Sequence, residues 1–421
     1  MSPIRRSRPC VLVYNPLAAH GHLDSWNEMF IGLLLEAGWR VLSLTPDGRQ
    51  LSERLDVKGI AGRDRLQILT WRDDVRPHIV ERIWLRLRRM IGHCARRAGL
   101  RKKRPVMPDP EASYLEPREF AQRVRAAIGE AQWSPDFVFN MYMDLYRTDV
   151  ERWSKFDKSF KWPWGGIRFV PHPAPTEGYY QIASCAGMCL LDEAVSARYQ
   201  KLLPAKAFAC LPDITDARLP DEPTRLVGEI VRRAAGRKVV FLGGTIGGNK
   251  NLARWIELIA LSDPEKWFFL QIGEINFNAL TQADAHALAI LEATPPENLL
   301  VHPEYLPDER GFNDVIRVSD IVFAVYRNFK ISSNMLGKAA AFRKPIIVAD
   351  NYLMGRRVTR YGIGRAVPEN DSRQMLAAAT DLVSNPIPVE NFAAYLTDFS
   401  VDKMREALLA FLDNRPGLKA G

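Results

Sequence analysis

Glycines and a lysine form the strongest candidate anion site in the sequence. The segment FLGGTIGGNKN, residues 241–251, places four glycines between an apolar stretch and a helical pattern. Glycines let backbone amides approach a phosphate closely, and a helix N-terminus adds positive potential. Lys250 supplies a cation for a phosphate oxygen. Because the spacing matches neither the P-loop nor the dinucleotide fingerprint, a tight turn beside a solvated lysine is the competing interpretation.

A second polar turn precedes a helical pattern in KISSNMLGKAAA, residues 330–341. Ser332, Ser333 and Asn334 follow a predicted strand and begin a predicted helix. Such side chains cap helix N-termini, and the amides of the same turn can hold a phosphate. The two roles are compatible, and both stay open.

Three histidines of the first half follow predicted strands. His20 and His22 lie in the loop after the first strand, and His172 follows a later one. A histidine at a strand end is a candidate base or substrate-orienting group, and a hydrogen-bonded loop histidine is the alternative. Asp144 and Glu177 are further carboxylates near strand ends. No His, Cys and carboxylate cluster has metal-ligand spacing, so we expect no metal site.

Alternating strands and helices must position these residues. In the first half, we predict strands at 11–14, 40–45, 65–70, 136–141 and 166–170, and helical stretches ending at 35 and spanning 78–98, 116–132, 178–182 and 192–204. In the second half, we predict strands at 238–243, 267–272, 298–302, 320–325 and 345–349, and helices at 252–262, 281–293, 310–318, 333–342 and 402–413. This order predicts an α/β fold with doubly wound parallel sheets, whose ligands bind at the carboxyl ends of the strands.

The proline-rich acidic segment 211–224 separates the two halves. We expect an N-terminal Rossmann-like domain at 1–210, a connection at 211–235, a C-terminal domain at 236–385 and a helical segment at 386–421. Two such domains joined by a short connection predict a cleft between them.

Composition narrows the class of protein. The chain has 421 residues, of which 47% are hydrophobic and 25% charged, as in globular proteins. No apolar run reaches the ~18 residues of a membrane-spanning helix, and the apolar start is expected to be a strand rather than a signal peptide. The five cysteines are scattered, which favours free thiols and a reducing cytoplasm.

The net charge of +9 has a local origin. Segment 81–104 contains ten Arg or Lys residues and one Glu, so the remainder of the chain is balanced, which argues against a nucleic-acid-binding surface. The apolar periodicity of 78–98 predicts a basic amphipathic helix that suits an anionic membrane, and a helix packed on its own domain is the alternative. The candidate membrane residues are Arg82, Trp84, Arg86, Arg89, Arg97, Lys102 and Lys103.

The second half resembles the nucleotide-sugar-binding domain of GT-B glycosyltransferases, in particular those like glycosyltransferase family 4. The first half is similar more loosely, through the histidine loops. The resemblance rests on GTIGGNKN at 244–251, FLQIG ending at Gly273, VHPEYLP at 301–307, SDIVFAV at 319–325 and SNMLGKAAAFRKPII at 333–347.

The resemblance implies two facing Rossmann-like domains and a C-terminal helix that crosses back to the first. It also implies a nucleotide sugar held by the second domain as substrate, an acceptor held by the first, and neither an obligatory metal nor another cofactor. His172 is the first candidate for catalysis, followed by His20 and His22. The implied donor-binding residues are Gly243, Gly244, Thr245, Gly247, Gly248, Lys250, Gly273, Glu304, Tyr305, Leu306, Lys330, Ser332, Ser333, Asn334 and Lys338.

The chain departs from the family where two glutamates are expected eight residues apart, because these positions are Lys330 and Lys338. Thr245 replaces an arginine that often follows the first glycine. Three explanations stay open: a different donor such as an acidic sugar, relocated acids, or a catalytically inactive relative. Nearby acids are Glu304, Asp320 and Asp350.

We therefore expect a cytoplasmic, metal-independent hexosyltransferase of the GT-B class. It would move a sugar from a nucleoside diphosphate to a glycan or lipid-linked acceptor in polysaccharide biosynthesis, peripherally at the inner membrane face. The alternatives are a nucleotide-sugar epimerase of the same fold and a non-catalytic, membrane-docked protein that binds glycan or nucleotide.

Overall fold

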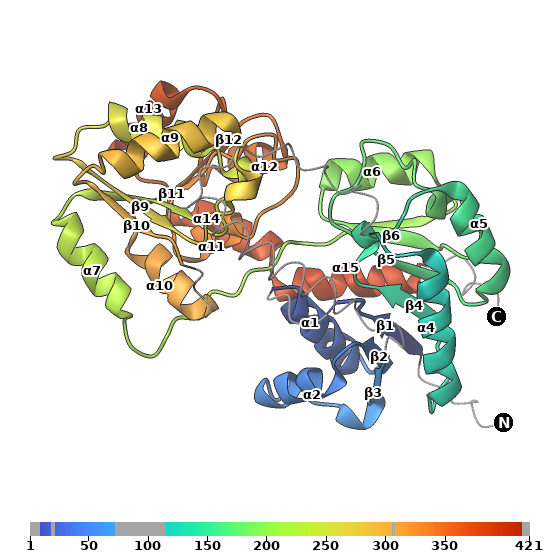
Figure 1. Ribbon diagram of the computed structural model, residues 1–421. Helices are drawn as coiled ribbons and strands as arrows, with labels where there is room; N and C mark the ends of the chain where they lie inside the picture. The colour runs from blue at the N-terminus through green and yellow to red at the C-terminus, as the bar shows by residue number, and fades with distance from the viewer. Residues whose placement is uncertain (1–8, 18–21, 72–113, 305, 307, 415–421) are drawn as a thin grey trace, which may run out of the picture. The chain divides into compact units, whose positions relative to one another are not determined.

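The computed structural model describes residues 9–17, 22–71, 114–304, 306 and 308–414. The chain forms two compact α/β units (Figure 1). Unit 1 holds the described residues up to Leu190, Val195–Ala209 and those from Phe411 onward. Unit 2 holds Leu191–Ala194 and Cys210–Ala410, and so includes the predicted connection.

Unit 1 is built on a seven-stranded sheet of order β3-β2-β1-β4-β5-β6-β7. The pairs from β3 to β6 are parallel. Strands β1 and β4 are buried along their whole length, as expected for parallel strands covered on both faces. The strands are β1 (Cys10–Tyr14), β2 (Arg40–Thr45), β3 (Leu66–Thr70), β4 (Phe137–Asn140), β5 (Trp164–Arg168), β6 (Gly187–Leu190) and β7 (Ala207–Cys210).

Aromatic side chains form much of the hydrophobic core of unit 1. Trp153 and Phe156 belong to α5 (Val150–Ser159), and Trp153 stacks on Trp164 of β5 with ring centroids 5.2 Å apart. The helices of unit 1 are α1 (His22–Glu36), α2 (Gly48–Val57), α4 (Pro117–Glu130), α5 (Val150–Ser159) and α6 (Glu193–Leu202), with short 3-10 turns at Arg63–Arg65, Met143–Leu145 and Gly178–Gln181.

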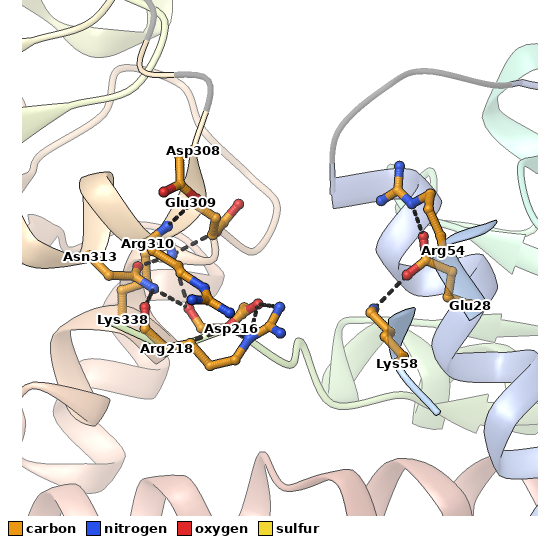
Figure 2. A network of polar contacts seen from close by, with 10 residues as sticks. All are labelled: Glu28, Arg54, Lys58, Asp216, Arg218, Asp308, Glu309, Arg310, Asn313 and Lys338. Carbon is orange, nitrogen blue, oxygen red and sulfur yellow. Dashed lines mark hydrogen bonds and ion pairs between the residues drawn. The ribbon is translucent and has the colours of Figure 1, made fainter. Parts of the chain in front are cut away.

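A buried carboxylate joins α1 to α2. Glu28 is only 1% exposed, and it forms ion pairs with Arg54 of α2 and with Lys58, the residue that follows α2 (Figure 2). Because an unpaired charge is costly to bury, these two cations allow Glu28 to lie inside unit 1.

Unit 2 contains a six-stranded sheet of order β10-β9-β8-β11-β12-β13, in which all pairs are parallel. Helices α8, α9 and α13 lie on one side of the sheet, and α7, α10, α11 and α14 lie on the other (Figure 1). The strands are β8 (Lys238–Gly243), β9 (Trp267–Ile272), β10 (Leu299–His302), β11 (Ile321–Ala324), β12 (Ile346–Ala349) and β13 (Gly364–Val367). The helices are α7 (Arg225–Ala234), α8 (Leu252–Leu261), α9 (Gln282–Ala293), α10 (Glu309–Val318), α11 (Met335–Ala341), α12 (Leu353–Tyr361), α13 (Ser372–Ser384), α14 (Val389–Asp398) and α15 (Val401–Asp413), with 3-10 turns at Gly248–Lys250 and Phe277–Ala279.

The predicted α/β class and doubly wound parallel sheets are confirmed. The strand predicted at 166–170 extends two residues too far, because β5 ends at Arg168. The amides of Phe169 and Val170 donate to the Asp144 carboxylate instead of to a neighbouring strand. The pattern missed β6, β7 and β13. Strands β6 and β13 begin with glycine and β7 contains two alanines, which are residue types that strands disfavour. The helix predicted at 78–98 lies outside the described residues.

The end of the chain contributes to unit 1. Phe411 of α15 packs edge-on against Phe137 and Phe139 of β4, with ring centroids 6.1 and 6.0 Å apart. The cleft between domains and the crossing of the C-terminal helix stay predictions.

Two glycines of unit 2 should respond in opposite ways to substitution by alanine. A Cβ at Gly364 would lie 1.8 Å from the Ile346 carbonyl oxygen, whereas one at Gly228, in α7, would meet nothing within 4 Å. We expect Gly364→Ala to lower the free energy of unfolding by about 2–3 kcal/mol. Gly228→Ala should raise it by about 0.5–1 kcal/mol, because alanine favours the helix. Urea denaturation followed by circular dichroism measures both, and equal stability of the two variants would contradict the packing of β13.

Candidate functional site

The candidate site lies where the strand order of unit 2 reverses. From β8 the chain proceeds through β9 to β10 at one edge of the sheet, then returns to β11 on the other side of β8. Loops that leave two such neighbouring strands diverge, and a crevice forms at their carboxyl ends. Here the two loops are 244–251 and 325–334, which overlap the two anion-binding candidates of the sequence, 241–251 and 330–341.

Backbone crowding explains the glycines at the start of this site. Gly244 has a φ of +88° and Gly273 a φ of +132°. A Cβ at Gly273 would lie 2.1 Å from the Gly244 carbonyl oxygen, so the loops after β8 and β9 pass each other only with glycine there.

Several amides of the glycine loop are left without acceptors. The N–H groups of Thr245, Gly247 and Gly248 donate to no atom of the described residues, although Ile246 between them donates to Glu274. Unpaired amides that gather in one turn are suited to an anion.

Lys250 joins the carboxyl ends of β8 and β11. Its Nζ donates to the Gly243 carbonyl oxygen at 2.9 Å and to the Tyr326 hydroxyl at 2.8 Å. The same nitrogen lies 4.0 Å from the centroid of the Tyr326 ring. An ammonium has three N–H donors, so one of them has no partner among the described residues and is available to an anionic ligand.

Arg327 fixes the glycine loop from the side of β11. Its guanidinium donates to the Gly248 carbonyl oxygen and to the Asp284 carboxylate, and its backbone amide donates to the Asn249 carbonyl oxygen at 2.8 Å. The loop is therefore held by both main chain and side chain of one residue.

Asp284 connects three elements beneath this loop. It is fully buried at the start of α9, where it accepts hydrogen bonds from the Thr281 hydroxyl and from the Ala253 amide of α8. Burial alone would raise the pKa of Asp284, but the hydrogen bonds from Thr281, Ala253 and Arg327 outweigh it and the pKa lies below its ordinary value. Asp284 thus stays charged and holds Arg327 in place.

The second loop presents small polar groups whose contacts are local. The Ser332 hydroxyl accepts a hydrogen bond from the Arg357 guanidinium at 2.8 Å. The Ser333 hydroxyl accepts one from the backbone amide two residues later, while Asn334 makes no side-chain cap. Lys330 is exposed. These contacts account for Ser332 and Ser333 locally, and a phosphate role for the loop stays a prediction.

Lys338 is a buried group with a complete set of partners. Only 1% of its side chain is exposed, and Nζ contacts a Glu309 carboxylate oxygen at 2.6 Å, the Asp216 carbonyl oxygen at 3.1 Å and the Asn313 side-chain oxygen (Figure 2). Burial lowers the pKa of Lys338, and Glu309 opposes this effect. All three N–H groups of the ammonium therefore have acceptors within unit 2, and a donor-binding role for Lys338 stays a prediction.

Lys338 and Asn313 also hold the chain that enters unit 2. Asn313 donates to the carbonyl oxygens of Asp216 and Arg218, at 2.9 and 2.8 Å. A Cβ at Gly337 would lie 2.9 Å from the side chain of Thr215. The proline-rich segment 211–224 is therefore anchored to α10 and α11 over part of its length.

The acids considered as replacements for the family's glutamates lie at different edges of the sheet. Asp320 precedes β11 and binds Lys238 and the Val239 amide at the amino edge, away from the carboxyl ends where the site is expected. Glu304 follows β10 and Asp350 follows β12, and both are exposed at the carboxyl edge. The sequence analysis did not identify Glu309 as the acid that pairs with Lys338. Its position at the start of the helix after β10 was the only sequence feature that placed it at the carboxyl edge.

Two further donor-binding candidates belong to the loop after β10. Leu306 is half-buried, and Tyr305 lies outside the described residues.

The histidines of unit 1 have contrasting positions. His172 is exposed, and its carbonyl oxygen accepts a hydrogen bond from the Tyr199 hydroxyl at 2.7 Å. His22 is the first residue of α1, and His20 lies outside the described residues, as do all the candidate membrane residues.

Asp144 secures the loop that carries His172. Its two carboxylate oxygens accept the amides of Phe169 and Val170, each at 2.8 Å. Arg168, which is nearly buried, lies 3.4 Å from Asp144 and 3.5 Å from the buried Glu177. Asp144 and Glu177 thus have structural partners in unit 1.

Neither a metal-binding cluster nor a membrane-spanning helix occurs in the part of the chain that the structure describes. No group of three or more His, Cys, Asp or Glu side chains there could hold a metal ion. None of the helices described combines the length and the apolar character needed to cross a bilayer. Whether the reaction needs a metal stays a prediction from the resemblance.

Replacing Asp284 by asparagine should destabilise unit 2, because Arg327 would lose its buried counter-charge. We expect a loss of about 3 kcal/mol in the free energy of unfolding at pH 7. Since the pKa is lowered in the folded protein, this difference should persist above about pH 4 and shrink as the pH falls further. Urea denaturation between pH 7 and pH 3 measures it, with Asp221→Asn, at an exposed loop position, as the control. A difference that does not change with pH would contradict the charged state of Asp284.

No protein-family model matches the chain, and no curated protein sequence matches it. Solved structures do resemble it. Trehalose-6-phosphate synthase OtsA is 12% identical with a TM-score of 0.64, and the match covers 97% of this chain and 100% of that one. HepE from Anabaena is 10% identical with a TM-score of 0.62, over 96% and 100% of the two chains. Sucrose-phosphate synthase from Thermosynechococcus elongatus is 10% identical with a TM-score of 0.60, over 97% and 98%.

These neighbours are glycosyltransferases of the GT-B class, and the similarity extends over both units of the chain. At this level of identity the comparison concerns the fold. The predicted architecture of two Rossmann-like domains is confirmed: the chain has the GT-B fold.

Proposed function

We propose that this protein is a glycosyltransferase that moves a sugar from a nucleoside diphosphate to an acceptor. The observation that carries the proposal is the position of Lys250 at the reversal of strand order. One N–H of its ammonium, and three amides of the same loop, have no acceptor among the described residues. This arrangement suits a diphosphate better than a neutral ligand, because it offers several donors and a full positive charge at one place.

The structural neighbours support a nucleotide-sugar donor. HepE has been solved in complex with UDP and glucose, and it shares the fold over nearly all of this chain. We propose that the present chain also binds a nucleotide sugar. Unit 2 would bind this donor, and loop 244–251 would contact its diphosphate.

The proposed chemistry is stabilisation of a leaving group. When the bond between the sugar carbon and the diphosphate oxygen breaks, negative charge grows on that oxygen while the acceptor oxygen bonds to the sugar and gives up a proton. Preorganised donors that meet this charge lower the barrier, since no solvent must reorganise around it. Lys250 and the amides of Thr245, Gly247 and Gly248 would act in this way. His172, an exposed side chain of unit 1, is our candidate for orienting the acceptor or accepting its proton.

Removing Lys250 should reduce turnover more than folding. We expect Lys250→Ala to lower the rate of nucleoside diphosphate release from a nucleotide sugar by about 100-fold, because one preorganised cation is lost. The measurement uses a panel of UDP-, GDP- and ADP-sugars with product analysis, which also separates transfer from epimerisation.

Lys266→Ala is the matched control, because Lys266 is 76% exposed before β9 at the amino edge. Unchanged turnover in Lys250→Ala would reject the proposed diphosphate contact. Failure of the unsubstituted protein to bind any of the nucleotides would reject the transferase proposal.

We propose further that the acceptor is a glycan or lipid-linked molecule at an anionic membrane. The support is the basic segment 81–104, whose net charge equals that of the whole chain. Each basic residue near such a surface contributes on the order of 1 kcal/mol.

Substituting Arg82, Arg86, Arg89 and Arg97 by glutamine should therefore weaken binding to vesicles that contain anionic lipid. Co-sedimentation at low and high salt measures this effect, with vesicles of neutral lipid as the control. If the protein does not bind these vesicles, or if its binding does not depend on salt concentration, the alternative that segment 78–98 packs on its own domain would be favoured.

A further inference from the structure

A cavity of about 200 Å³ lies at the amino edge of the unit 2 sheet, at the opposite ends of the strands from the glycine loop. It is enclosed by the starts of β8, β11 and β12, the end of α13, the loop that follows α13, and α14. Its charged lining consists of two cations and one acid, Lys238, Arg343 and Asp320, and the rest is apolar. A phosphate ion is small enough to enter a cavity of this size.

Arg343 presents an unpaired guanidinium to this cavity. The side chain is exposed, and its N–H groups donate to no atom of the described residues. The last carbonyl oxygens of α11 accept the backbone amides of residues 342–344, so the guanidinium is not needed to cap that helix. Five N–H donors in a planar fork are therefore available to an anion.

The backbone of Arg343 is also unusual. Its φ is +54°, in the left-handed region where helices commonly end with glycine. A side chain in this region costs free energy, and such costs are found where a residue serves a ligand. The position therefore has a residue that the backbone disfavours but that an anion would favour.

Lys344 adds a second cation without a hydrogen-bond acceptor in the part of the chain that the structure describes. The side chain is half-buried. Burial lowers the pKa of Lys344, and Asp320 opposes this effect. The neighbouring cations Arg317 and Lys238 lower the pKa further. The ammonium thus lies in a region of positive potential that a bound anion would relieve.

The acids at this edge are already paired. Asp320 binds Lys238 at 3.2 Å, and Asp314 binds Arg317 at 2.8 Å. These two acids neutralise two cations, so the positive charges of the adjacent residues 343 and 344 remain in excess. A net positive charge at a small cavity favours an anion with more than one negative charge.

We propose that this cavity is a second anion site, which binds the phosphate group of inorganic phosphate or of a phosphate monoester. Arg343 donates hydrogen bonds to two of the phosphate oxygens, and Lys344 contributes its charge. The site lies at the other edge of the sheet from the glycine loop, and it does not depend on the proposed function. A lipid headgroup and a soluble molecule can both carry such a phosphate.

The test is phosphate binding to the full chain at constant ionic strength. Calorimetry measures the affinity for inorganic phosphate and glycerol 3-phosphate, and co-sedimentation measures binding to neutral-lipid vesicles with and without phosphatidic acid. The variant is Arg343→Gly, which removes the guanidinium and suits the left-handed backbone. Ala235→Gly is the matched control, because Ala235 ends α7 with a φ of +50° and carries no charge. Thermal unfolding should show that both variants are at least as stable as the unsubstituted protein.

We expect Arg343→Gly to weaken phosphate binding by about tenfold or more, as for the loss of hydrogen bonds between charged groups. Ala235→Gly should bind phosphate as the unsubstituted protein does. A loss that is confined to vesicles with phosphatidic acid would also support the site, and would assign the phosphate to a lipid headgroup.

Three results would overturn the inference. One is that the unsubstituted protein binds none of these probes. Another is an equal loss in Arg343→Gly and Ala235→Gly, which would make the backbone rather than the guanidinium responsible. The third is binding that Arg343→Gly retains and Lys250→Ala abolishes, which would place the phosphate at the glycine loop and leave the proposed function intact.

Discussion

A buried charge that must be neutralised organises unit 2 around its candidate site. Asp284 has no exposed surface, and it remains ionised only because a hydroxyl, an amide and the Arg327 guanidinium all donate to it. The same guanidinium holds the glycine loop. Separating Arg327 from Asp284 would leave a buried charge without a partner, which is costly. The loop, with its amides that have no acceptor among the described residues, is therefore held in one conformation. Asp284 thereby connects α8, α9 and the loop after β11.

The lysines at the family's two glutamate positions have different physical meanings in the structure. Lys330 is exposed in the loop, where an ammonium is well solvated. Lys338 is buried, and a buried ammonium requires a nearby anion, which Glu309 supplies from another helix. Lys338 is therefore neutralised by an acid of α10 within unit 2.

Much of the fold could be predicted from local patterns. The strands 238–243 and 267–272 were predicted with their observed bounds, because each contains a run of four large apolar residues and ends in or before glycine. Short elements such as β13, with two half-buried residues out of four, carry too little periodicity to be recognised. At the site, Lys250 and the glycines were found because their signal lies within one loop. Arg327 and Asp284 were missed, since they meet only when α9 and the loop after β11 pack against α8.

The amino-acid sequence by itself determined the alternation of strands and helices, the two-unit architecture and the position of the glycine loop. These depend on hydrophobic spacing and on glycine, which act over a few residues. Only the tertiary structure decided which acidic side chain pairs with which basic side chain. Glu309, Glu304 and Asp320 are similar in sequence terms, but they lie at different edges of the sheet or pair with different partners. Such partners are chosen by the packing of helices over the sheet, and no local pattern encodes that choice.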